Sequence, residues 1–567
     1  MQKTLAVSAT AVCLAVAGAC GAGPPGDPRP PAYLEAVRAH CDKVLAIGRD
    51  VYGPKPTPLF VDGLDVESLQ PPRWRYGSAE WILANLANQQ NLLRTLCGLS
   101  ALTGDGQYKQ AAVDAMRYGI ENLRSPSGLL YWGGHAAYDA LSEEWVGRRK
   151  AGDRPRPWHE LMNHLPYYEL MHEIDPDYTA QFLGALWSAH VLRWSKLDID
   201  QHAELSMPLP PPDWDTRYLG GPVFFQGEGR SFVSIADDLI YAACMLHRFS
   251  DNEKPLLWAK RLAHRYVECR DPNTGLSGPM FSHREEVDRA QQQFAGALPG
   301  HVVTEATLWS PYASMSADLV WMMLGQECGP ACQELGQWAL EDLRAIAQVG
   351  YDPQRKVFQG LLIDGANVEN VRATQAGYFG DAGAPIRSAS DVLPSAFCTY
   401  ALAARISRDP FFWDMARQFA QVRGLGDIAP KAGDEPALSP TDSTEAAEIV
   451  GLIHLHHLAG RPEYLDQACR IADNILARKR VGGLFVDHPD HRYTRLDSPD
   501  ALVLLNLCAA MTGQEQAVPA YWFGSAYFAC EWENGRQQIY DTELYAQPRG
   551  QAASQPESLP RSQDRVE

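Results

Sequence analysis

The chain has 567 residues, which at roughly 150 residues per domain predicts three or four domains unless it forms one large closed fold. Hydrophobic residues make up 46% and charged residues 21%, a globular balance that excludes general disorder. With 50 basic and 69 acidic residues the formal charge is -19. This excludes a nucleic-acid partner, because phosphate neutralisation needs a basic surface.

The N-terminal residues predict export. An apolar run over residues 5–16 is too short to span a bilayer, and small residues and Cys20 follow it. We therefore expect a signal peptide over residues 1–19, a candidate lipid anchor at Cys20 and a Gly- and Pro-rich tether over residues 20–31. No later segment has about 18 consecutive apolar residues, so no transmembrane helix is expected. The predicted location is periplasmic or extracellular, with a membrane-anchored lipoprotein as the alternative.

The body of the chain reads as helices, because apolar residues recur at helical spacing between Gly-, Pro- and Asp-rich stops. The clearest predicted helices span residues 81–102, 108–123, 178–194, 232–249, 256–267, 446–458, 462–475 and 500–511. We expect fourteen helices in seven successive hairpins. Since there is neither a heptad pattern nor a fixed repeat, the prediction is an all-α (α/α)7 toroid over residues 32–512. A short β-rich segment over residues 513–547 and a disordered tail over residues 548–567 complete the predicted organisation.

The 12 cysteines, of which two precede residue 21, are spread too thinly for a disulfide scaffold. Cys328 and Cys332 are four positions apart in CGPAC and are able to pair in an oxidising compartment. The same spacing suits a metal site, but no second Cys or His pair lies nearby in the sequence. Ordinary buried thiols are the simpler interpretation.

Side chains that can bind a metal gather between residues 129 and 204. Six of the 16 histidines lie there, with Asp198 and Asp200 beside the last of them. These histidines are His135, His159, His164, His172, His190 and His202. The stretch HELMNH resembles the zinc-protease signature HExxH with one residue too many, so on a helix Glu160 and His164 would share a face but His159 and His164 would not. A protease is therefore disfavoured, and the cluster predicts a divalent transition-metal site built from separated loops.

Five stretches resemble the pectate lyases of polysaccharide lyase family 2, and the similarity runs from about Tyr33 to Ala510. They read VYGPKPTPLFVDGLD, ANQQNLLRTLCGLS, YWGGHAAYD, HELMNHLPYYELMHEIDP and LWSAHVLRWSKLDIDQHAEL. The resemblance implies an (α/α)7 barrel and a manganese-type ion held by His135, Glu160 and His202. It also implies cleavage of pectate or a related polyuronate by β-elimination. In that reaction the metal and cationic side chains bind the uronate carboxylate while a base removes the C5 proton.

One position departs from that family. The family's base is an Arg directly before the second metal-binding His, and this chain has Gln201 there. An amide has no useful basicity, so Gln201 cannot abstract a proton. Three alternatives remain: another residue is the base, the substrate or chemistry has changed, or the protein binds uronate oligosaccharides without turnover. The nearby candidates for a base are His164, Tyr167, Arg193 and Lys196.

A basic loop lies between the stretches that supply the first two expected metal ligands. It reads GRRKAGDRPRP and carries Arg148, Arg149, Lys150, Arg154 and Arg156 against one acidic residue. Because Arg pairs with carboxylates in a bidentate manner, the loop is a candidate binding site for an acidic polysaccharide despite the negative net charge. A solvated loop with no ligand is the alternative.

A second enzyme class is also open, namely an α/α glycoside hydrolase, which needs two carboxylates flanking one bond. Asp237 and Asp238 lie near the start of a predicted helix, and Asp62, Asp65 and Glu305 are candidate partners. Structural roles are the favoured interpretation for these carboxylates, since helix N-termini favour acidic residues.

Overall fold

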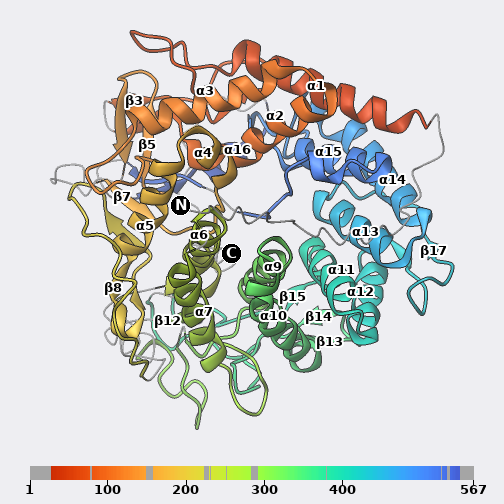
Figure 1. The fold of residues 1–567 in the computed structure, drawn as a ribbon. Coiled ribbons are helices and arrows are strands. Elements are labelled where there is room, and N and C mark those ends of the chain that lie inside the picture. Colours follow the sequence, from red (N-terminus) through yellow and green to blue (C-terminus); the bar gives the residue numbers. More distant parts are fainter. Residues whose placement is uncertain are drawn as a thin grey trace, which may run out of the picture.

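The computed structural model describes residues 27–76, 79–147, 157–221, 229, 231–250, 252–281, 292–304, 306–377, 380–524, 527–532 and 537–549. Its helices form a closed ring of two concentric layers, seen face-on in Figure 1. The inner helices are α2 (Gln90–Thr103), α4 (Tyr168–Ile174), α6 (Val233–Ser250), α9 (Pro311–Glu327), α11 (Pro394–Ser407), α13 (Ala446–Ala459) and α15 (Pro499–Thr512). Each packs against an outer helix: in the same order α3 (Gly106–Asn122), α5 (Pro176–His190), α7 (Glu253–Glu268), α10 (Gln333–Ala345), α12 (Pro410–Val422), α14 (Pro462–Arg478) and α1 (Arg29–Ile47).

This arrangement confirms the (α/α)7 toroid and follows from how the helices are patterned. Inner helices such as α15 bury side chains around the whole helix, whereas outer helices such as α14 bury one face and expose the other. None of the described helices is long and apolar enough to cross a membrane.

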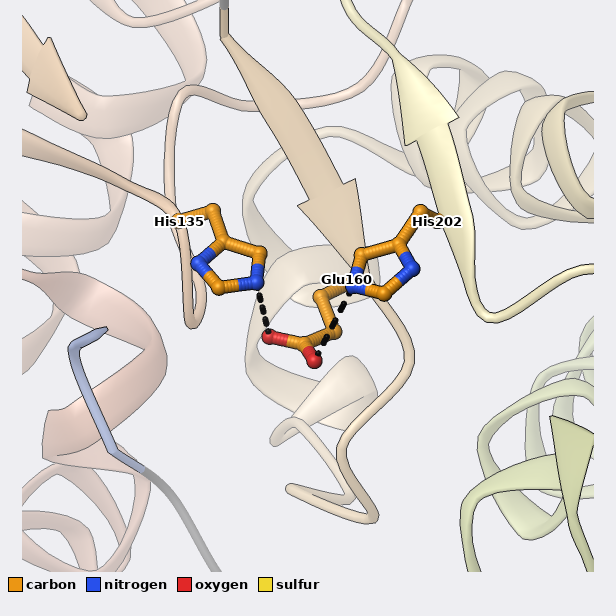
Figure 2. Close-up of side chains that lie close together, drawn as sticks. All are labelled: His135, Glu160 and His202. Atoms are coloured by element: carbon orange, nitrogen blue, oxygen red, sulfur yellow. Dashed lines mark ion pairs between the residues drawn. The ribbon is translucent and has the colours of Figure 1, made fainter. Parts of the chain in front are cut away.

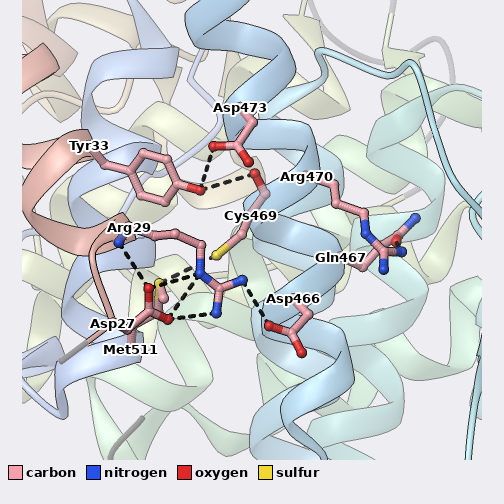
Figure 3. Close-up of polar contacts among 9 residues, drawn as sticks. All are labelled: Asp27, Arg29, Tyr33, Asp466, Gln467, Cys469, Arg470, Asp473 and Met511. Atoms are coloured by element: carbon pink, nitrogen blue, oxygen red, sulfur yellow. Dashed lines mark hydrogen bonds and ion pairs between the residues drawn. The ribbon is translucent and has the colours of Figure 1, made fainter. Parts of the chain in front are cut away.

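The ring closes between its first and last helices, so the expectation of seven successive hairpins is wrong for one pair. Helix α1 packs beside α15 and also contacts α14 (Figure 3). The Tyr33 hydroxyl donates to the Cys469 carbonyl at 3.1 Å and to Asp473 Oδ1 at 2.9 Å, and Arg29 Nη1 lies 2.8 Å from Asp466 Oδ1. Because α1 already begins at Arg29, the helix starts inside the stretch predicted as a tether.

Two predicted helices overran their true limits. Residues 79–84 form short strands, and a 3-10 turn (Leu86–Gln89) precedes α2, because Asn85 accepts a hydrogen bond from Ala87 N and starts the helical geometry only there. Helix α5 ends at His190, since the following residues pair as strands β8 and β9.

Short strands fill the connections between helices, in sheets of two or three strands. Their bounds are β1 (Gly63–Asp65), β2 (Trp74–Tyr76), β3 (Ala79–Trp81), β4 (Leu83–Ala84), β5 (Ala136–Asp139), β6 (Glu144–Gly147), β7 (Trp158–Glu160), β8 (Val191–Arg193), β9 (Asp198–Ile199), β10 (His202–Glu204), β11 (Ser231–Phe232), β12 (Met280–Phe281), β13 (Tyr351–Asp352), β14 (Val357–Phe358), β15 (Ser390–Asp391), β16 (Gly426–Asp427), β17 (Ala437–Leu438), β18 (Arg480–Val481), β19 (Leu484–Phe485), β20 (Tyr493–Arg495), β21 (Ala529–Trp532) and β22 (Gln537–Tyr540). Antiparallel pairs join β4–β5–β6, β7–β10 and β21–β22.

The C-terminal segment returns across the ring to these strands. In Figure 1 it runs in blue from α15 past the middle of the ring toward β5 and β7. Strand β21 meets the residues before β5, where Ala529 N donates to Gly134 O at 2.7 Å, and α16 (Asp541–Tyr545) follows β22. The division into a toroid and a C-terminal β-rich piece stays a prediction, and most of the predicted signal peptide, tether and tail lies outside the described residues.

Candidate functional site

Three expected ligands converge from three separate connections (Figure 2). Glu160 ends β7 and His202 begins β10, and the antiparallel register places these two residues directly opposite each other. Facing residues of an antiparallel pair point to the same side of the ribbon, so both side chains share one face. His135 is the residue directly before β5.

The ligand atoms of this triad all lie within 4.8 Å of one another. His135 Nε2 is 3.1 Å from Glu160 Oε2, and His202 Nε2 is 3.3 Å from Glu160 Oε1. The two imidazole rings are stacked, with centroids 5.3 Å apart and an interplanar angle of 21°. Two imidazole nitrogens and a carboxylate therefore point at one small volume.

The donor set fits a divalent transition metal. His135 Nδ1 lies 3.1 Å from the Ala529 carbonyl, which can only accept, so Nδ1 carries the hydrogen and Nε2 presents its lone pair to the site. Glu160 Oε2 is buried without a hydrogen-bond partner among the described residues, as expected of a carboxylate oxygen that awaits a cation. The side chain of His202 is 27% exposed, whereas those of His135 and Glu160 are 3% and 7% exposed, so the site opens on the His202 side.

Glu160 stays ionised although it is buried. Burial by itself would raise the pKa of this carboxyl, but the imidazoles of His135 and His202 and the hydroxyl of Tyr527 lower it to about 2. Burial and the adjacent carboxylate raise the pKa of Tyr527 well above its usual range, so its phenol is a donor to Glu160 at every working pH. Tyr527 also crowds the Gly-Gly turn, because a Cβ on Gly134 would lie 3.1 Å from its ring and 2.2 Å from Glu160 Oε2.

A buried amide holds the turn that presents His135. Asn85 Nδ2 donates to Gly133 O at 2.9 Å, and Gly133 N donates to Asn85 Oδ1 at 3.1 Å. Gly133 has a φ of 108°, a conformation that favours glycine, which explains the glycines before this histidine. Asp62 in turn accepts from Asn85 N at 2.7 Å, and burial raises the pKa of Asp62 to about 7. Asp62 therefore supports the turn rather than the chemistry.

His159 and His190 form a separate buried pair on the other face of β7. His159 Nδ1 lies 2.8 Å from His190 Nε2, and His190 Nδ1 lies 2.7 Å from Asp200 O. The carbonyl can only accept, so the hydrogens run from His159 to His190 and from His190 to the carbonyl. Burial lowers the pKa of His190 to about 4 and that of His159 well below its usual value, so both rings are neutral.

His164 does not join Glu160, and the helix assumed for HELMNH is absent. Residues 158–160 are strand β7, and the next residues form a turn in which Asn163 and Leu165 have positive φ. Asp238 accepts hydrogen bonds from Met162 N and Asn163 N, both at 2.8 Å, and these bonds fix the turn. His164 is buried there, with Nδ1 3.6 Å from Asp238 Oδ2 and its ring against Trp132.

The carboxylates considered for a glycoside hydrolase have structural partners. Asp237 accepts from Trp321 Nε1 at 2.7 Å, Asp238 holds the turn described above, and both are buried. Asp65 accepts from Glu67 N and Ser68 N and pairs with Arg492 at 2.7 Å. Glu305 lies outside the described residues.

The candidates for a base occupy different surroundings. Gln201 is 8% exposed, and its backbone carbonyl accepts a hydrogen bond from Leu161 N at 2.8 Å. Tyr167 packs on α2, where Arg94 stacks over its ring at 5.2 Å. Lys196 ends a 3-10 turn (Trp194–Lys196) between β8 and β9, and Arg193 is the exposed last residue of β8. Their catalytic roles stay predictions, and the basic loop with Arg148, Arg149, Lys150, Arg154 and Arg156 lies outside the described residues.

Sequence reasoning missed the contribution of the C-terminal segment to the site. Tyr527 contacts Glu160 although the two are far apart in sequence, and Ala529 anchors His135 from 394 residues away along the chain. The one available signal was the strand-like stretch AYWFGSAYFACEW, which contains both residues but does not say where the strand packs.

Comparisons with known proteins identify the family of the chain. The family model described as periplasmic pectate lyase matches residues 57–531. The chain belongs to the periplasmic pectate lyase family. It is 28% identical over 543 residues to the pectate disaccharide-lyase of Dickeya dadantii (strain 3937), covering 90% of this chain and 95% of that protein. Membership confirms the sequence resemblance and makes the chain an exported polysaccharide lyase.

Solved structures that share similarity with the chain include sugar-active enzymes. The family 76 glycoside hydrolase of Bacteroides thetaiotaomicron VPI-5482 superposes with a TM-score of 0.40 at 10% identity, over 86% of this chain and 100% of that one. The cellobiose 2-epimerase of Bacillus thermoamylovorans gives a TM-score of 0.39 at 11% identity, over 84% and 99% of the two chains.

Proposed function

We propose that this member of the pectate lyase family cleaves pectate or a related polyuronate by β-elimination, with a divalent ion held by His135, Glu160 and His202. Mn²⁺ is the first candidate, since imidazole and carboxylate ligands suit it and related transition metals. The observation that carries the proposal is the convergence of the two Nε2 atoms and the Glu160 carboxylate within 4.8 Å. The name of the Dickeya relative supports the substrate class.

An ion at this site would supply Lewis-acid stabilisation of the charge that develops on the uronate when C5 loses its proton. The residues of the chain would position the ion and the sugar carboxylate. Glu160 remains ionised because its neighbours lower its pKa to about 2. The partly exposed side chain of His202 would give a sugar carboxylate access to an ion held there, and the buried side of the site would exclude water.

The basic loop is the proposed binding site for neighbouring uronates. It connects β6 to β7, the strand that ends in Glu160, so its chain ends lie beside the triad. Arg148, Arg149, Arg154 and Arg156 would pair with sugar carboxylates and offset the long-range repulsion by the negative net charge.

Gln201 supports a second candidate function, that of a protein that binds uronate oligosaccharides without cleaving them. Its position is the one the family's base occupies, and an amide cannot take a proton. Tyr167 and Lys196 remain proposed substitutes, whereas the burial of His164 beneath Trp132 argues against a base that must reach a substrate. Hydrolysis by Asp237 and Asp238 is opposed by their burial and structural hydrogen bonds.

The deciding experiment incubates the purified protein with polygalacturonate and Mn²⁺ and follows the ultraviolet absorbance of the unsaturated product. Lyase activity predicts an absorbance increase that His202→Ala abolishes. The matched control is His172→Ala, which removes a histidine of the same sequence cluster that stacks on Phe249 outside the triad. New reducing ends without absorbance would indicate hydrolysis, and calorimetric binding without product would indicate the binding protein.

A further inference from the structure

Three cysteines lie close together in the C-terminal half of α6 and in the connection that follows α9. Cys244 lies on α6, Cys328 directly follows α9, and Cys332 ends the 3-10 turn (Gly329–Cys332) that leads into α10. The Sγ atoms of Cys244 and Cys332 are 3.9 Å apart, and both side chains are fully buried. Cys328 is half-buried, and its thiol interacts with both of the others.

We propose that Cys244 and Cys332 form a disulfide bond in the exported protein, and that Cys328 is the thiol through which oxidation enters. Disulfides form and persist in exported proteins, and the family is described as periplasmic. The sequence spacing suggested Cys328 with Cys332, whereas the structure brings a third cysteine, remote in sequence, against Cys332. A bond of about 2 Å requires the two sulfurs to approach by roughly 2 Å more.

Other described cysteines contact groups that cannot form a disulfide. Cys469 Sγ lies 3.5 Å from the Met511 sulfur, and Cys508 Sγ lies 3.4 Å from Pro30 O. Cys269, which directly follows α7, has its Sγ 3.2 Å from the Arg265 carbonyl of that helix. Among the sulfur contacts of the described residues, the one between Cys244 and Cys332 joins two cysteine Sγ atoms.

The oxidation balances as thiol–disulfide exchange with an external disulfide. The Cys328 thiolate attacks that disulfide and releases one external thiolate. The Cys332 thiolate then attacks the Cys328 sulfur and releases the second, and Cys244 attacks Cys332, which returns Cys328 to the thiol. Two protein thiols lose two protons and two electrons, and the external disulfide gains the electrons. Cys328 is half-buried, whereas Cys244 and Cys332 are fully buried, so Cys328 is the thiol of the three that an external disulfide can reach.

The bond would join α6 to the α9–α10 connection and close a loop of roughly 90 residues, which restricts the unfolded chain. It lies away from the metal centre, because the opposite ends of the same helices carry Asp238 and Ser316, which bond to the turn after Glu160. We therefore expect the oxidised protein to melt about 5 °C higher than the reduced protein, with unchanged ligand geometry at the triad.

Peptide mapping of the protein purified from the export compartment tests this directly. Free thiols are blocked with iodoacetamide during denaturation, and the unreduced digest is analysed by mass spectrometry. The expected result is a peptide containing Cys244 linked to the peptide containing Cys332, with Cys328 alkylated. Alkylation of all three cysteines, or a Cys328–Cys332 bond with alkylated Cys244, would overturn the proposal.

Two variants separate the bond from general packing effects. Cys328→Ser should keep the Cys244–Cys332 bond and the rise in Tm on oxidation, but form the bond more slowly during refolding with oxidised glutathione. Cys244→Ser should lose the dependence of Tm on reductant. If reductant lowers the Tm of wild type and of Cys244→Ser by the same amount, the proposed disulfide is wrong. Should either variant fold poorly, the peptide map of the wild-type protein gives the answer.

Discussion

The two faces of the β7–β10 ribbon carry histidines of the same sequence cluster but differ in chemistry. On one face Glu160 and His202 stand opposite each other and meet His135. A carboxylate oxygen of Glu160 accepts no hydrogen bond among the described residues, and the His202 side chain is partly exposed. On the other face His159 donates to His190, and His190 donates to a backbone carbonyl, so these two rings form a buried, neutral pair.

The difference shows that strand alternation decides which histidines can bind a metal. His159 and Glu160 are adjacent in sequence, yet side chains of successive strand residues point to opposite faces. Ligand atoms of one face converge on a shared volume. On the other face the lone pair of His190 Nε2 accepts the hydrogen of His159 Nδ1, and no group of three ligand atoms forms there among the described residues. The predictions below test this division, from the largest expected effect to the smallest.

Glu160→Gln should reduce kcat/KM on polygalacturonate by roughly a thousandfold or more, because it removes the charge that binds the ion and leaves a buried amide between two imidazoles. Initial rates of product absorbance at saturating Mn²⁺ give the measurement. His172→Ala should stay within about twofold of wild type. Full activity of Glu160→Gln would show that this face of the ribbon does not take part in catalysis.

Gln201→Arg should raise kcat by roughly a hundredfold, the usual contribution of a positioned general base, if the missing base limits turnover. The variant introduces, directly before His202, the residue type that the family resemblance implies for the base. Steady-state kinetics on polygalacturonate provide the comparison, with Gln201→Lys as a control for charge alone. An unchanged or lower kcat would show that another residue already supplies the base.

Tyr527→Phe should weaken Mn²⁺ binding by about tenfold, the lower end of the effects seen for groups that orient metal ligands. The ring and its packing remain, and only the hydrogen bond to Glu160 is lost. Titration of the apo protein with Mn²⁺ by calorimetry measures the change. An unaltered affinity would indicate that the C-terminal segment is not needed to orient Glu160.

His190→Gln should change Mn²⁺ affinity by no more than about twofold, and its effect should fall on the pH dependence of stability. The pKa of His190 is about 4 in the folded chain because of burial, so between pH 6.5 and 4 the unfolded chain binds a proton that the folded chain does not. Stability from His190 is therefore present above pH 6.5 and is lost as the pH falls toward 4, by up to about 3 kcal/mol. Urea unfolding at a series of pH values should show that the free energy of unfolding falls less steeply toward acid pH in the variant than in wild type. Identical pH profiles would contradict a neutral buried His190.

The sequence predicted the toroid because apolar residues recur at helical spacing in many successive segments, with neither a heptad pattern nor a fixed repeat. The predicted helix ends were least accurate where apolar residues form strands, as in residues 79–84. A short apolar run has no periodicity that distinguishes a strand from a helix. The pairing of α1 with α15 was not predictable, because helix order alone does not show where a ring closes.

The ligand set was predictable from the resemblance, and the geometry supports it. The comparison of HELMNH with the zinc-protease signature assumed a helix, whereas these residues form a strand and a turn. The turn that Asp238 holds cannot be inferred from local propensity. Tyr527 and Ala529 join the site only through long-range packing of β21, so no local pattern could place them there.

The central claim is that the Glu160 face binds a metal and the His159 face does not. Its most direct test is elemental analysis after loading with Mn²⁺ and exhaustive dialysis, for wild type, His202→Ala and His159→Ala. The account predicts stoichiometric metal in wild type and His159→Ala and none in His202→Ala. Metal retained by His202→Ala but lost from His159→Ala would contradict it.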